Sequence, residues 1–293
     1  MAPLIELLHS SSAYFIFTLA TAGLLVGSFL NVVIHRLPVM MENQWRQESE
    51  AFLDPDKEPE SGVRYNLVVP ASSCPQCGHN IRAWENIPVF SYLLLRGRCS
   101  DCKTSISARY PVIEVISAVL TVMIGMKFGV TWQTLMLCVF GWSLLTLTVI
   151  DFDTQLLPDS ITLPLVWVGL IANHLGLLVS LEDALWGAVA GYLILWSIYW
   201  LFKLITGKEG MGYGDFKLLA ALGAWLGWMK LPLIILLSSL VGTVIAVLLI
   251  VMKRQERSNP IPFGPFLAIA GLIALLWGDT LIQSYMQFSG LAY

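Results

Sequence analysis

The chain has 293 residues, of which 56% are hydrophobic and only 13% are charged, and its formal net charge is −3. A soluble domain carries roughly twice that charged fraction, so the composition excludes a water-soluble globular protein and predicts an all-α protein that crosses the membrane several times. The small negative charge gives no support for a nucleic-acid-binding surface.

Apolar runs of about 20 residues predict about eight transmembrane helices. They lie near residues 13–34, 112–128, 131–150, 160–180, 184–205, 216–229, 231–252 and 263–283. Three domains follow: a first transmembrane helix at 1–34, a soluble domain at 35–111 and a transmembrane domain at 112–293.

Positive charges gather on one side of the predicted helices. They are frequent in 35–111 and recur at Lys203, Lys208, Lys253, Arg254 and Arg257, whereas the opposite loops carry Glu182, Asp183 and Asp279. Basic loops stay in the cytoplasm, so we expect residues 35–111 to be cytoplasmic and both termini to face the other side.

The soluble domain has two parts. Residues 41–66 are acidic and lack apolar periodicity, which predicts a mobile or loosely packed insertion. The second part contains Cys74 and Cys77, then Cys99 and Cys102, each pair in C-x2-C spacing. Two such pairs predict one tetrahedral, structural Zn2+ site without an open position. Two disulfides are the alternative, which a reducing cytoplasm disfavours.

Two aspartates lie at predicted borders of membrane helices. Asp151 follows one apolar run, and Asp215 precedes another, directly after Gly210, Gly212 and Gly214. Carboxylates near hydrocarbon are costly, so the pair indicates an acid protease at the membrane face. A carboxylate at a helix N-terminus is also favourable without any function. The glycines allow a close approach of substrate backbone, or simply close helix packing.

Five motifs in one order carry a family resemblance. They are Gly27–Pro38, the two cysteine pairs, Ile106–Glu114, Asp151 with Leu157-Pro158-Asp159, and Gly212-Tyr213-Gly214-Asp215-Phe216-Lys217. Over nearly its whole length the chain resembles the type IV prepilin peptidases, which are GxGD aspartic proteases. The resemblance makes 112–293 the peptidase domain and Asp151 and Asp215 its catalytic pair, since the first aspartate lies seven residues before Pro158. It assigns no catalysis to Asp153 or Asp159.

The resemblance implies two activities in the bacterial inner membrane. The first is cleavage of the leader peptide of prepilins or type II secretion pseudopilins at the cytoplasmic face, in contact with the pilus or secretion machinery. The second is N-methylation of the new N-terminus with S-adenosylmethionine. Candidates for the methyl-donor site are Asn31, Arg36, Gly97, Arg109 and Glu114. Arg36 and Arg109 are equally well explained as interface anchors.

Three other interpretations stay open at this point. The acidic residues 42–60 either attract a basic leader peptide or form a solvated loop. Lys217 is interpreted as a lysine whose ammonium reaches the membrane interface. For the whole chain, the alternatives are a proton-coupled transporter and a zinc-scaffolded assembly factor without catalysis.

Overall fold

The computed structural model describes residue 8 and residues 10–54, 65–252 and 261–290. The predicted cytoplasmic cations Lys57, Arg64, Lys253, Arg254 and Arg257 lie outside these ranges. Within them the chain is helical, and the β-structure consists of two isolated bridges. The chain divides into two compact units, Met1–Thr134 and Leu135–Tyr293, and each is described by itself.

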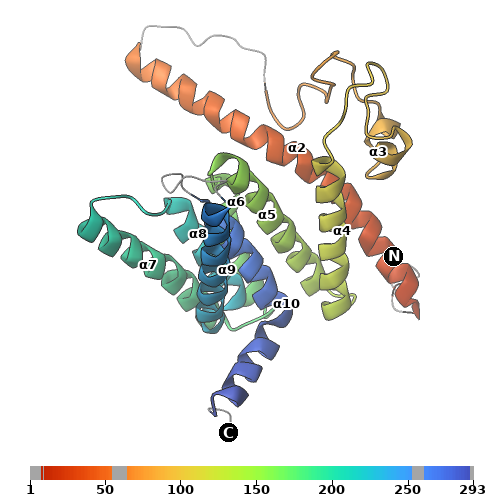
Figure 1. Ribbon diagram of the computed structural model, residues 1–293. Helices are drawn as coiled ribbons and strands as arrows, with labels where there is room; N and C mark the ends of the chain where they lie inside the picture. Colours follow the sequence, from red (N-terminus) through yellow and green to blue (C-terminus); the bar gives the residue numbers. More distant parts are fainter. Residues whose placement is uncertain (1–7, 9, 55–64, 253–260, 291–293) are drawn as a thin grey trace. The chain divides into compact units, whose positions relative to one another are not determined.

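The first unit is built on two long helices, α2 (Ser12–Leu53) and α4 (Arg109–Phe128), which lie side by side (Figure 1). Small residues allow the backbones of α2 and α4 to approach closely, since a β-carbon at Gly23 would lie 2.6 Å from Cα of Ala118. The Ser117 hydroxyl donates a 2.8 Å hydrogen bond to the Gly23 carbonyl. This small-residue packing is a common way for membrane helices to associate.

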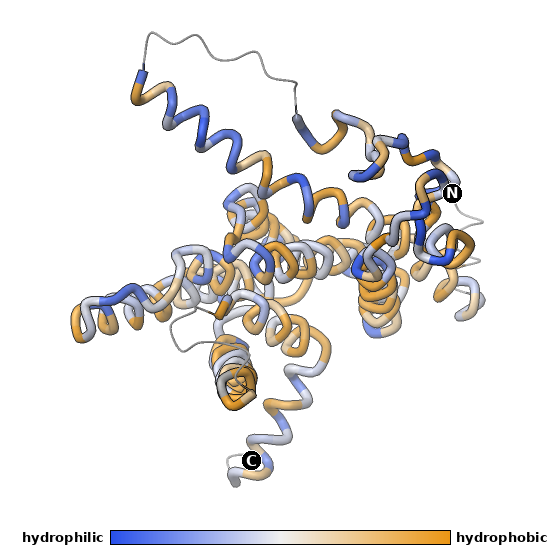
Figure 2. Tube along the Cα trace, turned by 45° about the horizontal axis from the view of Figure 1, so that its top comes forward, coloured by the Kyte–Doolittle hydropathy of each residue, from blue (hydrophilic) through white to orange (hydrophobic). Residues whose placement is uncertain are grey.

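Helix α2 continues beyond the predicted span and corrects the prediction of an insertion over residues 41–66. The helix runs through Pro38 to Leu53, and Figure 2 shows that its second half is hydrophilic. Good helix formers and the 2.8 Å hydrogen bond from Gln44 to Glu48 favour helix there. Its side chains are exposed over residues 43–54, as in a loosely packed segment, while residues 55–64 lie outside the described ranges.

The second unit is a helical bundle around α8 (Tyr213–Leu226) (Figure 1). The other elements are α5 (Trp132–Thr154), α6 (Asp159–His174), α7 (Leu181–Thr206), η2 (Trp228–Lys230), α9 (Leu231–Val251) and α10 (Gly264–Phe288). Helices α6, α7, α9 and α10 contact α8, and Phe140 of α5 stacks on Trp225 with ring centroids 4.7 Å apart. Helix α8 is therefore a core element, and almost all of it is buried.

Each of the eight predicted membrane segments coincides with a helix, although α6 ends at His174 and not at residue 180. Among the described residues, six helices are long and apolar enough to cross a membrane. The exceptions are α6 and α8, which have 16 and 14 residues. At 1.5 Å per residue, α8 is only about 21 Å long, which is shorter than the hydrocarbon core of a bilayer. Its apolar sequence is explained by burial inside protein.

Candidate active site and metal centre

Asp151 and Asp215 lie at two helix ends in the second unit. Asp151 is in the last turn of α5, which closes at Gln155 with a left-handed residue (φ 56°) whose N–H donates to the Asp151 carbonyl over 2.9 Å. Asp215 is the third residue of α8, after the N-cap Gly212. Its side chain accepts a hydrogen bond from the Gly212 backbone, as acidic residues do in a capping box. Asp215 therefore lies at the N-terminus of a helix, where a carboxylate is favourable, as the sequence predicted.

Capping alone does not explain the burial of this pair. Asp151 is 5% exposed and Asp215 is 7% exposed. One oxygen of each carboxylate, Oδ2 of Asp151 and Oδ1 of Asp215, is buried without a hydrogen-bond partner. The two carboxylates interact electrostatically, although they lie on different helices. Burying a charge without a partner is expensive, so two buried carboxylates of this kind are candidates for proton chemistry.

The glycines before Asp215 differ in their surroundings. A β-carbon at Gly214 would lie 2.7 Å from Cβ of Leu157, so this position admits no side chain without movement. A β-carbon at Gly212 would make only an ordinary 3.9 Å contact with Asp215. Of the two expected explanations, close packing accounts for Gly214, whereas a side chain at Gly212 would begin without a clash.

Asp151 and Asp215 are called the dyad from here on. For three residues near the dyad, the structure shows something that the sequence did not indicate. Asp153 is exposed, two residues beyond the buried Asp151. Lys217 forms an ion pair with Asp159, with 2.7 Å from Nζ to each carboxylate oxygen, instead of simply reaching the interface. Gly264, the first residue of α10, contacts Asp151. Its sequence setting, a glycine between Phe263 and Pro265, is the one signal that could have drawn attention to it.

The four predicted cysteine ligands come together in the first unit. Their sulfur atoms all lie within 4.8 Å of one another, and Sγ of Cys74 is 3.8 Å from Sγ of Cys102. Four sulfurs at about 2.3 Å around one Zn2+ are about 3.8 Å apart, whereas a disulfide needs about 2.05 Å. The cysteines are free, so the geometry fits a tetrahedral metal site and not the disulfide alternative.

Two equivalent turns present these sulfurs. A β-bridge joins Ser73 and Asn80 across the first cysteine pair, and another joins Arg98 and Ser105 across the second. The turns close through left-handed residues, Gly78 at φ 73° and Lys103 at φ 61°. Glycine adopts this conformation without steric cost, which explains the Gly78 that directly follows the first cysteine pair.

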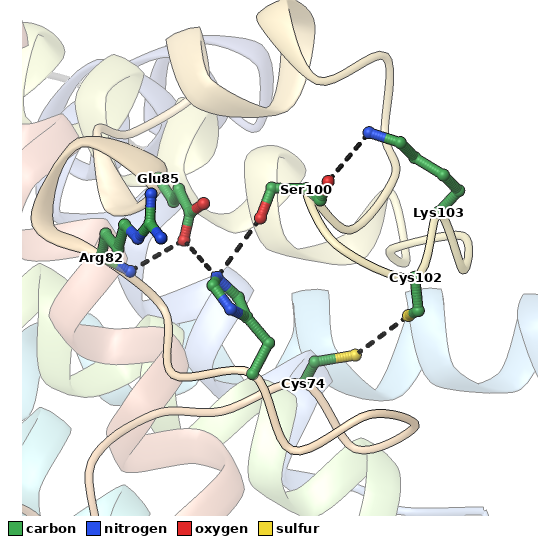
Figure 3. A network of polar contacts seen from close by, with 7 residues as sticks. Cys74, Arg82, Glu85, Ser100, Cys102 and Lys103 are labelled. Atoms are coloured by element: carbon green, nitrogen blue, oxygen red, sulfur yellow. Dashed lines mark hydrogen bonds and ion pairs between the residues drawn. The ribbon is translucent and has the colours of Figure 1, made fainter.

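A polar network links the two turns (Figure 3). Nε2 of His79 lies 3.3 Å from the Ser100 hydroxyl and 3.1 Å from Oε2 of Glu85. Glu85 also accepts a 2.8 Å hydrogen bond from the Arg82 backbone N–H. Hydrogen bonds from Ser100, Arg82 and His79 lower the pKa of Glu85 to about 2. The carboxylate is therefore an ionised link between the first turn, the second turn and η1 (Ala83–Asn86).

Three of the methyl-donor candidates are buried near the α2–α4 contact. Asn31 donates a 3.1 Å hydrogen bond to the Tyr110 carbonyl, and Arg36 donates one of 3.0 Å to the Asn66 carbonyl. Glu114 accepts a 2.8 Å hydrogen bond from the backbone N–H of Val89. Val89 has φ 61°, a strained conformation for a β-branched residue.

The other two candidates lie elsewhere in the first unit. Gly97 is left-handed at φ 65°, and a β-carbon there would lie 2.8 Å from the Tyr92 hydroxyl. Arg109 is exposed at the start of α4. The structure thus brings Asn31, Arg36 and Glu114 to buried positions on α2 and α4 and leaves Gly97 beside the second cysteine turn.

Comparison with known proteins agrees with both units. The model of the bacterial peptidase A24 N-terminal domain matches residues 21–128, and that of the type IV leader peptidase family matches residues 138–247. Prepilin leader peptidase/N-methyltransferases are 58% identical in Stutzerimonas stutzeri and 57% identical in Pseudomonas aeruginosa, covering 98% of this chain and 99% of each relative. The one from Aeromonas hydrophila is 55% identical with the same coverage. No solved structure gives a significant match.

A multi-pass helical protein with two buried aspartates and a four-cysteine site falls among the membrane aspartic peptidases. The chain belongs to the type IV leader peptidase family, beside the prepilin leader peptidase/N-methyltransferases. The resemblance seen in the sequence motifs is confirmed. The transporter and assembly-factor alternatives have no support from this family.

Proposed function

We propose that this chain cleaves the leader peptide of type IV prepilins or type II secretion pseudopilins, and that Asp151 and Asp215 carry out the hydrolysis. The observation that carries the proposal is the burial of two interacting carboxylates, each with one unpartnered oxygen, on different helices of one bundle. The identity to prepilin leader peptidases over almost the full chain supports this substrate class.

The dyad supplies both proton transfers that amide hydrolysis needs. Two close carboxylates do not readily ionise together, so one is protonated while the other is charged. The charged carboxylate takes a proton from water as the water oxygen attacks the peptide carbonyl carbon. The protonated carboxylate then gives its proton to the leaving nitrogen as the carbon–nitrogen bond breaks. Because the two groups exchange roles, their titration belongs to the pair.

We place this reaction at the cytoplasmic face of the bacterial inner membrane, with both termini in the periplasm. The basic loops of the sequence support that orientation through the positive-inside rule. A prepilin has a polar leader followed by an apolar helix, so its scissile bond falls at this interface. The glycines before Asp215 would allow an extended substrate backbone to approach closely.

The second proposed activity is methylation of the newly formed N-terminus with S-adenosylmethionine, at a site formed by the cytoplasmic domain at 35–111 and the adjoining parts of α2 and α4. The names of the relatives support it. The buried Asn31, Arg36 and Glu114, with Gly97 and Arg109, are the proposed residues of the site. A Zn2+ held by Cys74, Cys77, Cys99 and Cys102 would stabilise the fold and leave no position for catalysis.

Mass spectrometry of a purified prepilin incubated with the enzyme tests the peptidase. Asp151→Asn and Asp215→Asn should each abolish the cut fragments while the detergent-solubilised protein keeps its melting temperature within a few degrees. Asp153→Asn, a matched change on an exposed neighbour, should retain activity within a factor of a few. Full processing by either buried-aspartate variant would overturn the assignment.

A further inference from the structure

Gly264 lies at an unusual place for a glycine, at the start of α10 and against the carboxylate of Asp151. A β-carbon built on Gly264 would lie 2.5 Å from Oδ2 of Asp151 and 3.2 Å from its Cγ. The same β-carbon would lie 3.1 Å from Cδ1 of Leu157, the residue that also closes on Gly214. The backbone of α10 therefore touches a side chain that α5 supplies.

Space, rather than backbone conformation, explains why the residue is glycine. Gly264 is helical and is not among the left-handed glycines of the described residues. The preference for alanine over glycine, about 1 kcal/mol, applies to a helix interior and does not decide the first residue of α10. The Asp151 carboxylate occupies the volume that any side chain would need.

The contact is also polar. The first N–H groups of a helix have no partner within the helix. The Gly264 backbone donates a hydrogen bond to the Asp151 carboxylate, and the N-terminal end of α10 favours negative charge there. Asp215 has a parallel arrangement with Gly212 at the start of α8. Each aspartate therefore lies against the N-terminus of a helix. Asp215 lies against the start of its own helix, α8, whereas Asp151 on α5 lies against the start of α10.

We infer that Gly264 is a positioning residue of the peptidase: its backbone N–H orients the Asp151 carboxylate, and its missing side chain admits that carboxylate to the start of α10. The inference rests on the proposed function of the dyad. It makes α10 a third part of the active site, beside the end of α5 and the start of α8.

Gly264→Ala tests the inference by kinetics with a synthetic prepilin peptide. A displacement of about 1 Å at a catalytic group can cost about 100-fold in rate, so kcat should fall by that order. The KM should change less than about threefold, because the substrate is held by other surfaces. The control is Gly278→Ala in the same helix, where the new β-carbon would make only an ordinary 3.5 Å contact with Lys230. Its kcat should stay within twofold of wild type.

A double-mutant cycle covers the case in which Gly264→Ala is poorly folded. Asp151→Ala removes the carboxylate that the new β-carbon would meet, so Gly264→Ala should lower the melting temperature much less in that background than in wild type. Equal losses of melting temperature in both backgrounds would show that the two residues are not coupled, and would overturn the inference.

The outcomes separate the two proposals. If Asp151→Asn is inactive but Gly264→Ala keeps wild-type kcat, the dyad stands and the role of Gly264 is wrong. If Asp151→Asn is fully active, the dyad itself is wrong. A loss in Gly264→Ala that appears as a raised KM with unchanged kcat would also contradict the inference, since it would indicate substrate binding instead of carboxylate positioning.

Discussion

Lys217 Nζ lies 2.7 Å from both carboxylate oxygens of Asp159, which joins the fifth residue of α8 to the first residue of α6. Lys217 is two residues beyond Asp215, and Asp159 begins the helix that follows the segment carrying Asp151. The ion pair therefore connects the two stretches of chain that bear the dyad. Its side chains are 26% and 54% exposed, so its contribution to stability is small, below about 1 kcal/mol.

Lys217→Met should therefore lower cleavage more than stability. We expect kcat to fall by less than about tenfold and the unfolding free energy by less than about 1 kcal/mol. Asp159→Asn should have a similar effect, and the double variant should be little worse than either one. Lys230→Met, which breaks the ion pair with Asp279 (3.0 Å), is the control and should leave kcat unchanged. Additive losses in the double variant would show that the pair does not act as a unit.

Much of the fold was predictable because membrane helices depend on local composition. Apolar runs located the eight longest helices of the described residues, and C-x2-C spacing located the four sulfurs that come together. The end of the first helix was predicted wrongly, since loss of apolar character was taken for loss of helix. The composition of residues 42–53 favours an exposed helix instead.

The site was predictable only in part. Buried aspartates are informative in a membrane sequence because few structural roles require them. The contact between Gly264 and Asp151 depends on how α10 packs against the end of α5, and no local pattern encodes such a contact. The same is true of Lys217, whose partner lies 58 residues away in the sequence.

Asn173 offers a test of the bundle itself. Its side-chain amide donates to the carbonyls of Ala224 (2.8 Å) and Trp225 (3.1 Å), and its oxygen accepts from the N–H groups of Leu178 and Val179. Asn173→Ala leaves these buried backbone groups unpaired, so the unfolding free energy should fall by about 3 kcal/mol. Thermal unfolding in detergent measures this. The exposed neighbour His174→Ala should change it by less than about 0.5 kcal/mol.

Metal content is the next test. Elemental analysis should find one Zn2+ per chain, since the four sulfurs form a single cluster. Cys99→Ser should lose the metal and make residues 65–108 sensitive to protease, because metal-binding energy at such a site is folding energy. Cys138→Ser, at a buried cysteine within α5, should keep full metal content. Metal-free protein from a chelator-free preparation would contradict the proposed site.

Gly97 tests the separation of the two proposed activities. Gly97→Ala would place a β-carbon 2.8 Å from the Tyr92 hydroxyl, so the second cysteine turn must shift. We expect the rate of methylation of a synthetic peptide that already begins with the mature N-terminus to fall about tenfold. The rate of prepilin cleavage should stay within about twofold of wild type. Gly78→Ala is the matched control: it is also left-handed, but nothing lies within 4 Å of its β-carbon. Equal loss of both activities in a folded Gly97→Ala would favour one shared site.

Helix α2 has 42 residues, so it is about 63 Å long, roughly twice the thickness of the hydrocarbon core. The part beyond Pro38 is about 23 Å long, and its side chains are largely exposed. Pro38 has no N–H, so α2 lacks one backbone hydrogen bond at this point. A tilt of about 10° at Pro38 would carry the far end through ~4 Å. A small change of angle at Pro38 would therefore give a much larger displacement at Leu53.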